Sequence, residues 1–150
     1  MVKVVATNRK ALRDYTIYEK METGIVLSGT EVKSLRDGGA ALEGGYARVE
    51  NGAVFLYDVN IAPYRQGNIF NRDPKRRRKL LLHKAEIKWL FGKTTRRGFT
   101  LIPLRIYFND RGIAKVELAL GKGKKMVDRR AELKRRALEE EERRRTSRWR

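Results

Sequence analysis

The sequence predicts a mainly β domain in which an antiparallel sheet closes on itself. About six segments have strand composition, the connections between them are short, and few stretches before residue 121 carry helix signals. Short connections favour antiparallel neighbours, because a parallel pair needs a crossover of a dozen or more residues. Closure removes the unpaired edges of a sheet. We therefore expect a small closed barrel of the OB type with two to three short helices attached.

The first predicted strands lie at Tyr15–Lys20 and Gly24–Leu27, which are rich in β-branched and aromatic residues. A hairpin follows, with Tyr46–Glu50 and Ala53–Ile61 as its two strands. Asn51-Gly52 between them suits a type I′ turn, which needs two residues with positive φ. The polar stretch 65–78 is expected to be a mobile loop.

Two helices are predicted in this part of the chain. Ser28 and Glu31 match the capping box, in which a serine and a glutamate three residues later satisfy backbone amides at a helix start. This box predicts a short helix over Val32–Arg36. The apolar spacing in His83–Phe91 predicts a second helix, which we expect to stop at Gly92.

The last two strands are predicted at Phe99–Phe108 and Ile113–Leu120. Pro103 lies inside the first of them and cannot donate a ladder hydrogen bond, so it predicts an edge or a bulge. Apolar and polar residues alternate in the second, as in a half-buried strand. The expected organisation is a basic N-terminal arm over residues 1–14, the barrel over 15–120 and a basic C-terminal tail over 121–150.

The charge balance indicates a polyanionic partner. Lys and Arg number 36 against 18 Asp and Glu, a net charge of +18. Such an excess favours nucleic acid first and an anionic membrane surface second. We find no apolar run long enough to span a membrane and no signal peptide, and the chain has no cysteine. A cytoplasmic protein fits best.

Motifs for catalysis are missing from the sequence. It has no Walker loop, no HExxH, no Gly-x-Ser-x-Gly and no Cys/His metal spacing. His83 alone cannot supply an acid–base pair. The sequence therefore predicts a binding protein rather than an enzyme, without a cofactor or a metal.

The strongest local binding signal is the basic run Lys75–Lys79, which Leu80–Leu82 follow. Adjacent cations repel one another, and arginine forks bind phosphate with two parallel hydrogen bonds. We interpret the run as a phosphate-binding surface that the leucines anchor to the core. The alternative is a solvated run that aids solubility.

Three further positions leave alternatives open. Glu31 can complete the cap with Ser28, accept hydrogen bonds from a base edge, or orient a neighbouring cation within a basic surface. His83 can be a structural hydrogen-bond partner or stack on a base. Asn8 can contact RNA or lie in a disordered arm.

The tail over residues 121–150 combines basic charge with helix propensity. It carries 13 Lys and Arg against 6 Asp and Glu, and pairs such as Glu139–Arg143 have the favourable i,i+4 order. It has no apolar stripe that could dock on a core. We expect this segment to be disordered alone and to fold on a polyanion. The alternative is a solvated helix or a disordered solubility tail.

Five motifs in order give the chain a resemblance to a known family. They are Asn8–Ala11 (NRKA), Gly24–Arg36 (GIVLSGTEVKSLR), Pro74–Lys84 (PKRRRKLLLHK), Gly98–Leu104 (GFTLIPL) and Gly123–Arg130 (GKKMVDRR). The chain resembles the bacterial SsrA-binding protein family, or small protein B, from Asn8 to about Arg136.

The resemblance implies an OB-type barrel that binds the tRNA-like domain of transfer-messenger RNA. It implies delivery of that RNA to stalled ribosomes in trans-translation, with elongation factor Tu as an indirect partner. The tail is then expected to become helical in the empty messenger channel near the decoding centre. We expect a monomer. The alternative is a ribosomal or ribosome-assembly protein with a basic tail.

The resemblance also assigns candidate residues. For the body it implies RNA contacts, with Glu31 as the contact glutamate, by Asn8, Arg9, Lys10, Glu31, Lys33, Arg36, Arg76, Arg78, Lys79, Leu82, His83, Lys84 and Lys115. For the tail it implies ribosome contacts by Lys122, Lys124, Lys125, Asp128, Arg129, Arg130 and Lys134. The family often has an aromatic residue or histidine where this chain has Val127, so base stacking there is left open.

Overall fold

The computed structural model describes residues 2–64, 73–96, 98–124 and 135–143. Among its described residues, the body up to residue 124 has nine strands and three helices, and residues 135–143 form a fourth helix. Within the described part of the chain, no helix is long and apolar enough to cross a membrane. With nine strands and only four helices, the described part of the chain is mainly β, as the sequence predicts.

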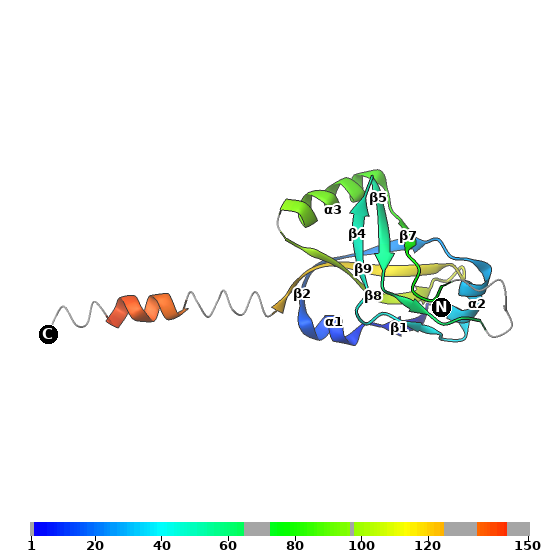
Figure 1. Ribbon diagram of the computed structural model, residues 1–150, viewed down its shortest axis with the longest axis horizontal. Coiled ribbons are helices and arrows are strands. Elements are labelled where there is room, and N and C mark those ends of the chain that lie inside the picture. The colour runs from blue at the N-terminus through cyan, green and yellow to red at the C-terminus, as the bar shows by residue number, and fades with distance from the viewer. Residues whose placement is uncertain (1, 65–72, 97, 125–134, 144–150) are drawn as a thin grey trace.

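Six strands form a closed ring of hydrogen bonds (Figure 1). In ring order they are β8 (Thr100–Phe108), β4 (Tyr46–Glu50), β5 (Ala53–Tyr57), β7 (Arg78–Leu81), β2 (Tyr15–Ile25) and β9 (Ala114–Gly123). The pairing of β8 with β9 closes the ring. All these pairings are antiparallel, which confirms the predicted closure and the predicted strand direction.

The expected N-terminal arm is part of the folded body. Lys3–Thr7 forms strand β1, which pairs with β8 outside the ring, and Arg9–Asp14 forms helix α1. The basic side chains concealed a strand signal, because Val4 and Val5 favour a pleated surface. A further two-stranded sheet joins β3 (Ala40–Ala41) to β6 (Asn60–Ile61).

The core fills the inside of the ring. Leu56, Leu80, Leu101, Ile106 and Val116 come from four different strands and are almost completely buried. Burial of each such side chain contributes about 1.5–3 kcal/mol. Along β9 the buried residues alternate with partly exposed ones as far as Leu118, which confirms the predicted alternation.

The predicted turn at Asn51-Gly52 and the irregularity predicted at Pro103 are both confirmed. Asn51 and Gly52 have φ values of 49° and 75° between β4 and β5. Strand β5 ends at Tyr57 rather than at Ile61, because Asp58 adopts a φ of 57° and breaks the ladder. The β8–β9 register shifts between Pro103 and Arg105, so Pro103 marks a bulge.

Both predicted helices form, but the predicted end is correct only for the first of them. Helix α2 (Gly29–Arg36) begins with the complete capping box of Ser28 and Glu31. Helix α3 (Lys84–Arg96) continues through Gly92, so the predicted stop there is wrong. Buried Leu90 holds this part of the helix against the core, and the Thr94 hydroxyl donates to the Leu90 carbonyl at 2.9 Å.

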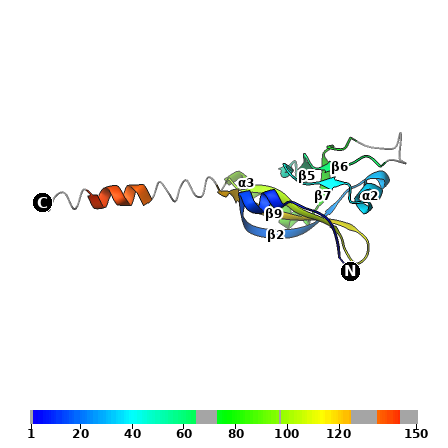
Figure 2. The same ribbon diagram turned by 90° about the horizontal axis from the view of Figure 1, so that it is seen from below.

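The tail begins later than predicted. Strand β9 reaches Gly123, which pairs with Tyr15, so residues 121–123 belong to the sheet. Residues 135–143 form a helix whose side chains are all exposed (orange in Figures 1 and 2). Residues 125–134 and 144–150 lie outside the described part, and so do the predictions for Lys125, Val127, Asp128, Arg129, Arg130 and Lys134.

Candidate nucleic-acid interface

Glu31 lies at the centre of a buried ion cluster, which we define as Glu31, Arg76 and Arg78. It is in the first turn of α2 and only 4% exposed. Its Oε1 accepts a hydrogen bond from the Ser28 amide at 2.9 Å and another from Arg76 Nη2. Its Oε2 accepts from Arg76 Nε at 3.1 Å and from Arg78 Nε at 2.7 Å. Both carboxylate oxygens are therefore used within the fold.

Arg78 is 1% exposed and donates inward along its whole guanidinium group. Beside the contact with Glu31, Nη1 donates to the Val59 carbonyl at 2.8 Å and Nη2 to the Pro74 carbonyl at 2.9 Å. These bonds fix the segment before β7 against α2. The strand period explains the orientation, because alternate residues of β7 point to opposite faces and Arg78 shares the inner face with Leu80.

The cluster changes the acidity of its carboxyl group. Burial raises the pKa of Glu31, but hydrogen bonds from Arg76, the Ser28 amide and Arg78 outweigh burial and hold the pKa below its ordinary value. Glu31 therefore remains charged at neutral pH. Of the three roles that the sequence leaves open for Glu31, the structure favours capping combined with orientation of cations.

The predicted basic run is thus divided between two faces. Lys75, Arg77 and Lys79 are exposed, whereas Arg78 is buried and Arg76 is partly covered. Arg77 lies 4.1 Å from the Phe55 ring centre and pairs with Glu50 at 3.3 Å. The three exposed cations can meet a phosphate, whereas Arg78 can do so only by leaving its buried partners.

A second group of residues lies across four strands on the outside of the ring. Leu81 pairs with Gly24, Gly24 with Lys115, and Lys115 with Tyr107, so these residues share one face of β7, β2, β9 and β8. Glu22 belongs to the same face, with Oε1 3.9 Å from Lys115 Nζ. We call Glu22, Leu81, Tyr107 and Lys115 the outer face.

Leu81 is the most unusual member of the outer face. It is an apolar residue with 52% of its surface exposed, beside buried Leu80. Gly24 leaves room for the Leu81 side chain, because a Cβ at position 24 would lie only 3.1 Å from Leu81 Cβ. In this group the apolar side chain can contact a base and the lysine can contact a phosphate, while the glutamate can accept hydrogen bonds from a base edge.

Tyr107 is only 6% exposed, so it supports the outer face through a fixed hydroxyl group rather than by exposing its ring. Its hydroxyl donates to Glu22 Oε2, and the Arg105 guanidinium lies 5.5 Å from its ring centre. Burial and the hydrogen bond to Glu22 raise the pKa of Tyr107 to about 12. Of these residues only Lys115 was predicted from the sequence; Glu22, Leu81 and Tyr107 become candidates because they lie beside it. The alternation of Leu80 and Leu81 along β7 was the signal that could have indicated an exposed leucine.

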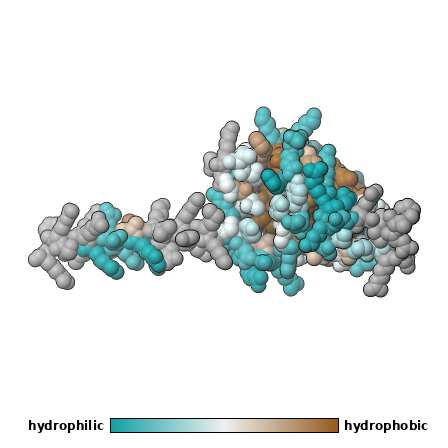
Figure 3. All heavy atoms as spheres, viewed as in Figure 1, coloured by the Kyte–Doolittle hydropathy of each residue, from teal (hydrophilic) through white to brown (hydrophobic). Residues whose placement is uncertain are grey.

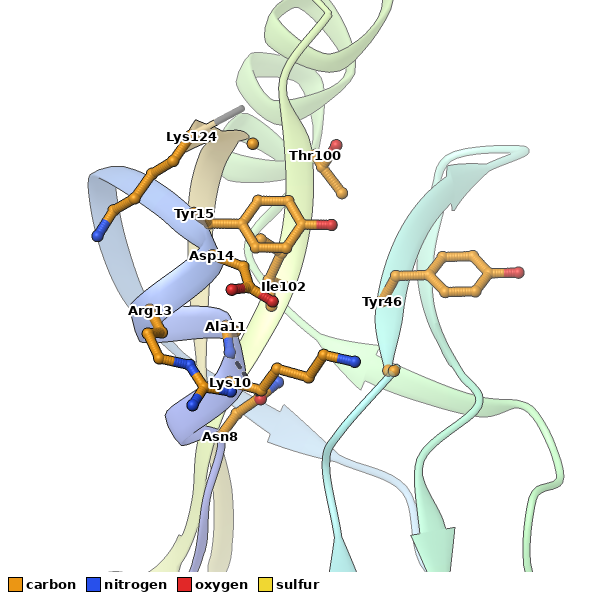
Figure 4. A pocket seen from close by; sticks show the side chains of 13 residues that line it. Asn8, Lys10, Ala11, Arg13, Asp14, Tyr15, Tyr46, Thr100, Ile102 and Lys124 are labelled. Atoms are coloured by element: carbon orange, nitrogen blue, oxygen red, sulfur yellow. Dashed lines mark hydrogen bonds between the residues drawn. The ribbon is translucent and has the colours of Figure 1, made fainter. Parts of the chain in front are cut away.

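An open groove of about 810 Å³ lies beside α1 (Figure 4). Lys10 and Arg13 of α1 line it together with Lys124, which follows β9. Tyr15 and Tyr46 also line the groove, Tyr15 on the side of α1 and Tyr46 on the opposite side, from β4 (Figure 4). The groove brings together Lys10, predicted for the body, and Lys124, predicted for the tail.

Asn8 also lines this groove but is 2% exposed and serves the fold. Its Nδ2 donates to the carbonyls of Pro103 at 3.0 Å and Leu42 at 3.3 Å, and its Oδ1 accepts from the Ala11 amide at 3.1 Å. A direct RNA contact by Asn8 would require breaking these bonds. The structure favours a role in positioning α1, and hence Lys10.

Comparison with known proteins decides the family. The model of the SmpB protein family matches residues 5–148. The chain belongs to the SmpB protein family. The match includes all five motifs on which the resemblance rests.

Individual members of the SmpB family are close to this chain over most of its length. An SsrA-binding protein of Moorella thermoacetica is 58% identical over 132 residues, which cover 88% of this chain and 85% of the relative. That of Alkaliphilus oremlandii is 60% identical over 131 residues, or 87% of this chain and 84% of the relative. A solved structure described as "tmRNA-SmpB: a journey to the center of the bacterial ribosome" contains a similar chain. Its TM-score is 0.68 at 53% identity, over 81% of this chain and 84% of that chain.

The structure spreads the other residues predicted from the SmpB family over several surfaces. Lys33, Arg36, Arg9 and Lys84 are exposed, Lys33 Nζ lies 5.7 Å from the Tyr64 ring, and Lys122 Nζ lies 4.5 Å from the Phe99 ring. Leu82 is half-buried against the core, and His83 is exposed, with its backbone amide donating to Glu86. Hydrophilic side chains cover much of the body in Figure 3, with apolar ones between them.

Metal chemistry finds no support at these surfaces. No group of three or more His, Cys, Asp or Glu that could hold a metal ion occurs among the residues that the structure describes. The arrangement instead offers exposed cations, partly exposed aromatic rings and one apolar side chain on a rigid closed sheet. That combination suits binding of a structured RNA.

Proposed function

We propose that the protein binds the tRNA-like domain of transfer-messenger RNA and delivers this RNA to stalled ribosomes. The observation that carries the proposal is the match to the SmpB family over residues 5–148, because relatives named SsrA-binding protein are 58% and 60% identical to the chain. The net charge of +18 supplies the electrostatic attraction. The protein acts as an adaptor, without catalysis and without a cofactor.

The RNA contact of the body is assigned to two exposed surfaces. One is the outer face, and the other is formed by the cations Lys75, Arg77 and Lys79 that the buried ion cluster holds in place. Glu31 and Arg78 are positioning residues in this proposal. The ring of six strands serves as an OB-type barrel, a scaffold that presents nucleic-acid contacts on its outer strands.

The ribosome contact is assigned to the groove beside α1 and to the tail that begins there. A neighbour of 53% identity comes from a structure described as tmRNA-SmpB in the bacterial ribosome. Lys10, Arg13 and Lys124 place positive charge where the chain leaves the sheet. The tail enters the empty messenger channel as a helix, while elongation factor Tu acts through the RNA. Because ribosomes are cytoplasmic, the protein is expected to act in the cytoplasm. We expect it to act as a monomer.

A truncation after Lys124 tests this division. Because β9 ends at Gly123, the shortened chain keeps every strand of the ring. Affinity for the tRNA-like domain should stay within about twofold of the full chain, whereas peptide tagging on stalled ribosomes should be abolished. The matched control is a chain that ends after Arg143, which retains the helix at 135–143. Loss of RNA affinity on truncation after Lys124 would contradict the division into body and tail.

A further inference from the structure

Helix α3 presents an aromatic residue to solvent on the side away from the core. Leu90 faces inward and is completely buried, whereas Trp89, the residue before it, is 40% exposed. Indole is the largest aromatic side chain, and exposure of this size leaves part of its ring available to a partner. Neither the family motifs nor the two proposed RNA surfaces include Trp89.

The neighbours of Trp89 on the helix surface leave the ring accessible. Residues three and four positions apart are neighbours on a helix, which makes Ala85 and Gly92 neighbours of Trp89. A Cβ at Gly92 would meet nothing within 4 Å. The space that a side chain at Gly92 would fill is therefore open.

Two cations lie near the same position. Lys93 Nζ lies 5.5 Å from the centre of the Trp89 ring, and the adjacent residue Lys88 is exposed. Glu86, the acidic residue in the first turn of α3, directs its carboxylate to the His83 amide at 3.1 Å. A flat apolar ring beside two lysines favours a ligand that combines a flat ring with negative charge.

We propose that Trp89 is a stacking platform for an unpaired base of the tRNA-like RNA, with Lys88 and Lys93 binding the adjoining phosphates. This inference rests on the proposed RNA-binding function and adds a contact to it. Helix α3 directly follows β7, which carries Lys79 and Leu81, so one RNA can reach both elements. A lipid surface fits less well, because Ala85 and Gly92 give this side of the helix little apolar area to insert.

The intrinsic fluorescence of Trp89 measures contact between its ring and the RNA directly. The chain has two tryptophans, Trp89 and Trp149, so the variant Trp149→Phe keeps Trp89 as the sole reporter. Titration of this variant with the tRNA-like domain should quench its fluorescence with the same midpoint as RNA binding measured by filter retention. Trp89→Ala in the full chain should weaken RNA binding about tenfold, and Trp89→Phe should restore most of the loss.

Phe91→Ala is the matched control. Phe91 is 53% exposed but lies about 160° from Trp89 around the helix axis, so its removal should leave RNA affinity unchanged. RNA binding without quenching, or unchanged affinity of Trp89→Ala, would overturn the platform and leave the proposed function intact. Quenching by vesicles of anionic phospholipid but not by RNA would overturn it in favour of a membrane contact. If even the wild-type chain fails to bind the RNA, the proposed function itself fails.

Discussion

The buried ion cluster and the outer face contain similar residues and differ in what surrounds them. Each contains an ion pair between segments that are distant in the sequence. The pair is Glu31 with Arg78 in the cluster and Glu22 with Lys115 on the outer face. The side chains of Glu31 and Arg78 are at most 5% exposed, whereas that of Glu22 is 55% exposed. Burial makes the first pair depend on protein partners. The second pair can exchange its weak mutual contact for an RNA contact.

This difference shows why charge alone does not locate an interface. An exposed ion pair stabilises a protein by at most about 1 kcal/mol, so its members can bind a ligand without harm to the fold. A buried pair that loses one member leaves an uncompensated charge. Function is therefore expected where the charges are exposed, and the buried cluster is expected to act by holding the exposed cations in place.

The largest effect is expected from breaking the buried ion cluster. Arg78→Met should lower the free energy of unfolding by about 3–5 kcal/mol, because Glu31 is then left buried with a weaker set of partners. Urea unfolding followed by circular dichroism measures this change. Lys79→Met is the matched control, since Lys79 is adjacent but exposed, and should change stability by less than about 0.5 kcal/mol. Equal losses in the two variants would remove the distinction between the faces.

The cluster should also make stability depend on acid pH. The folded-state pKa of Glu31 is lowered, so its stabilising effect is complete above the unfolded value of 4.5 and is lost as pH falls below it. Between pH 6 and about pH 3, the wild type should therefore lose more stability than Glu31→Gln. Unfolding midpoints at a series of pH values measure both. Parallel pH profiles would mean that Glu31 has an ordinary pKa in the folded protein.

A smaller effect, seen in binding alone, is expected on the outer face. Leu81→Gln should weaken binding of the tRNA-like domain by about tenfold, corresponding to about 1.4 kcal/mol, with little change in stability. The reason is that half of the Leu81 surface is exposed, so the proposed RNA contact would bury apolar area that the fold leaves open. Fluorescence anisotropy of labelled RNA measures the affinity. Exposed Ile113, with 51% of its surface accessible in the turn before β9, provides the control as Ile113→Gln.

The smallest effect concerns the helix cap beneath the cluster. Ser28→Ala removes the hydroxyl that accepts from the Glu31 amide at 3.3 Å, which should cost about 1 kcal/mol of stability. Ser28→Asp should recover most of it, since aspartate caps as well as serine. Thermal unfolding compares the three proteins. A loss as large as that of Arg78→Met would show that the cap, rather than the ion cluster, organises this region.

Local signals predicted the elements that local chemistry determines. The capping box of Ser28 and Glu31 and the Asn51-Gly52 turn depend on neighbouring residues, and both were located correctly. The alternation along β9 and the bulge at Pro103 follow from the strand period and from the missing amide of proline. Ring closure also followed, because short connections leave antiparallel neighbours as the simplest arrangement.

Tertiary contacts decided what the sequence could not. The Gly92 stop failed because Leu90 packs into the core and carries the helix onward. Lys3–Thr7 forms β1, despite the basic residues that follow it in sequence, because β8 provides a strand with which it pairs. At the candidate site, Arg78 in the basic run cannot be told from its neighbours until the strand period is known. Leu81 becomes a candidate contact only once strand pairing places it beside Gly24, which itself pairs with Lys115.

The salt dependence of RNA binding tests the central claim most directly. The claim is that exposed residues, such as those of the outer face, contact the RNA, whereas the buried ion cluster makes no RNA contact of its own. In a plot of log affinity against log salt concentration, Lys115→Met should reduce the slope by about 0.7–0.9, the value of one lost phosphate contact. Arg78→Met, measured where circular dichroism shows it folded, should keep the wild-type slope. An unchanged slope for Lys115→Met with a reduced slope for Arg78→Met would contradict the account.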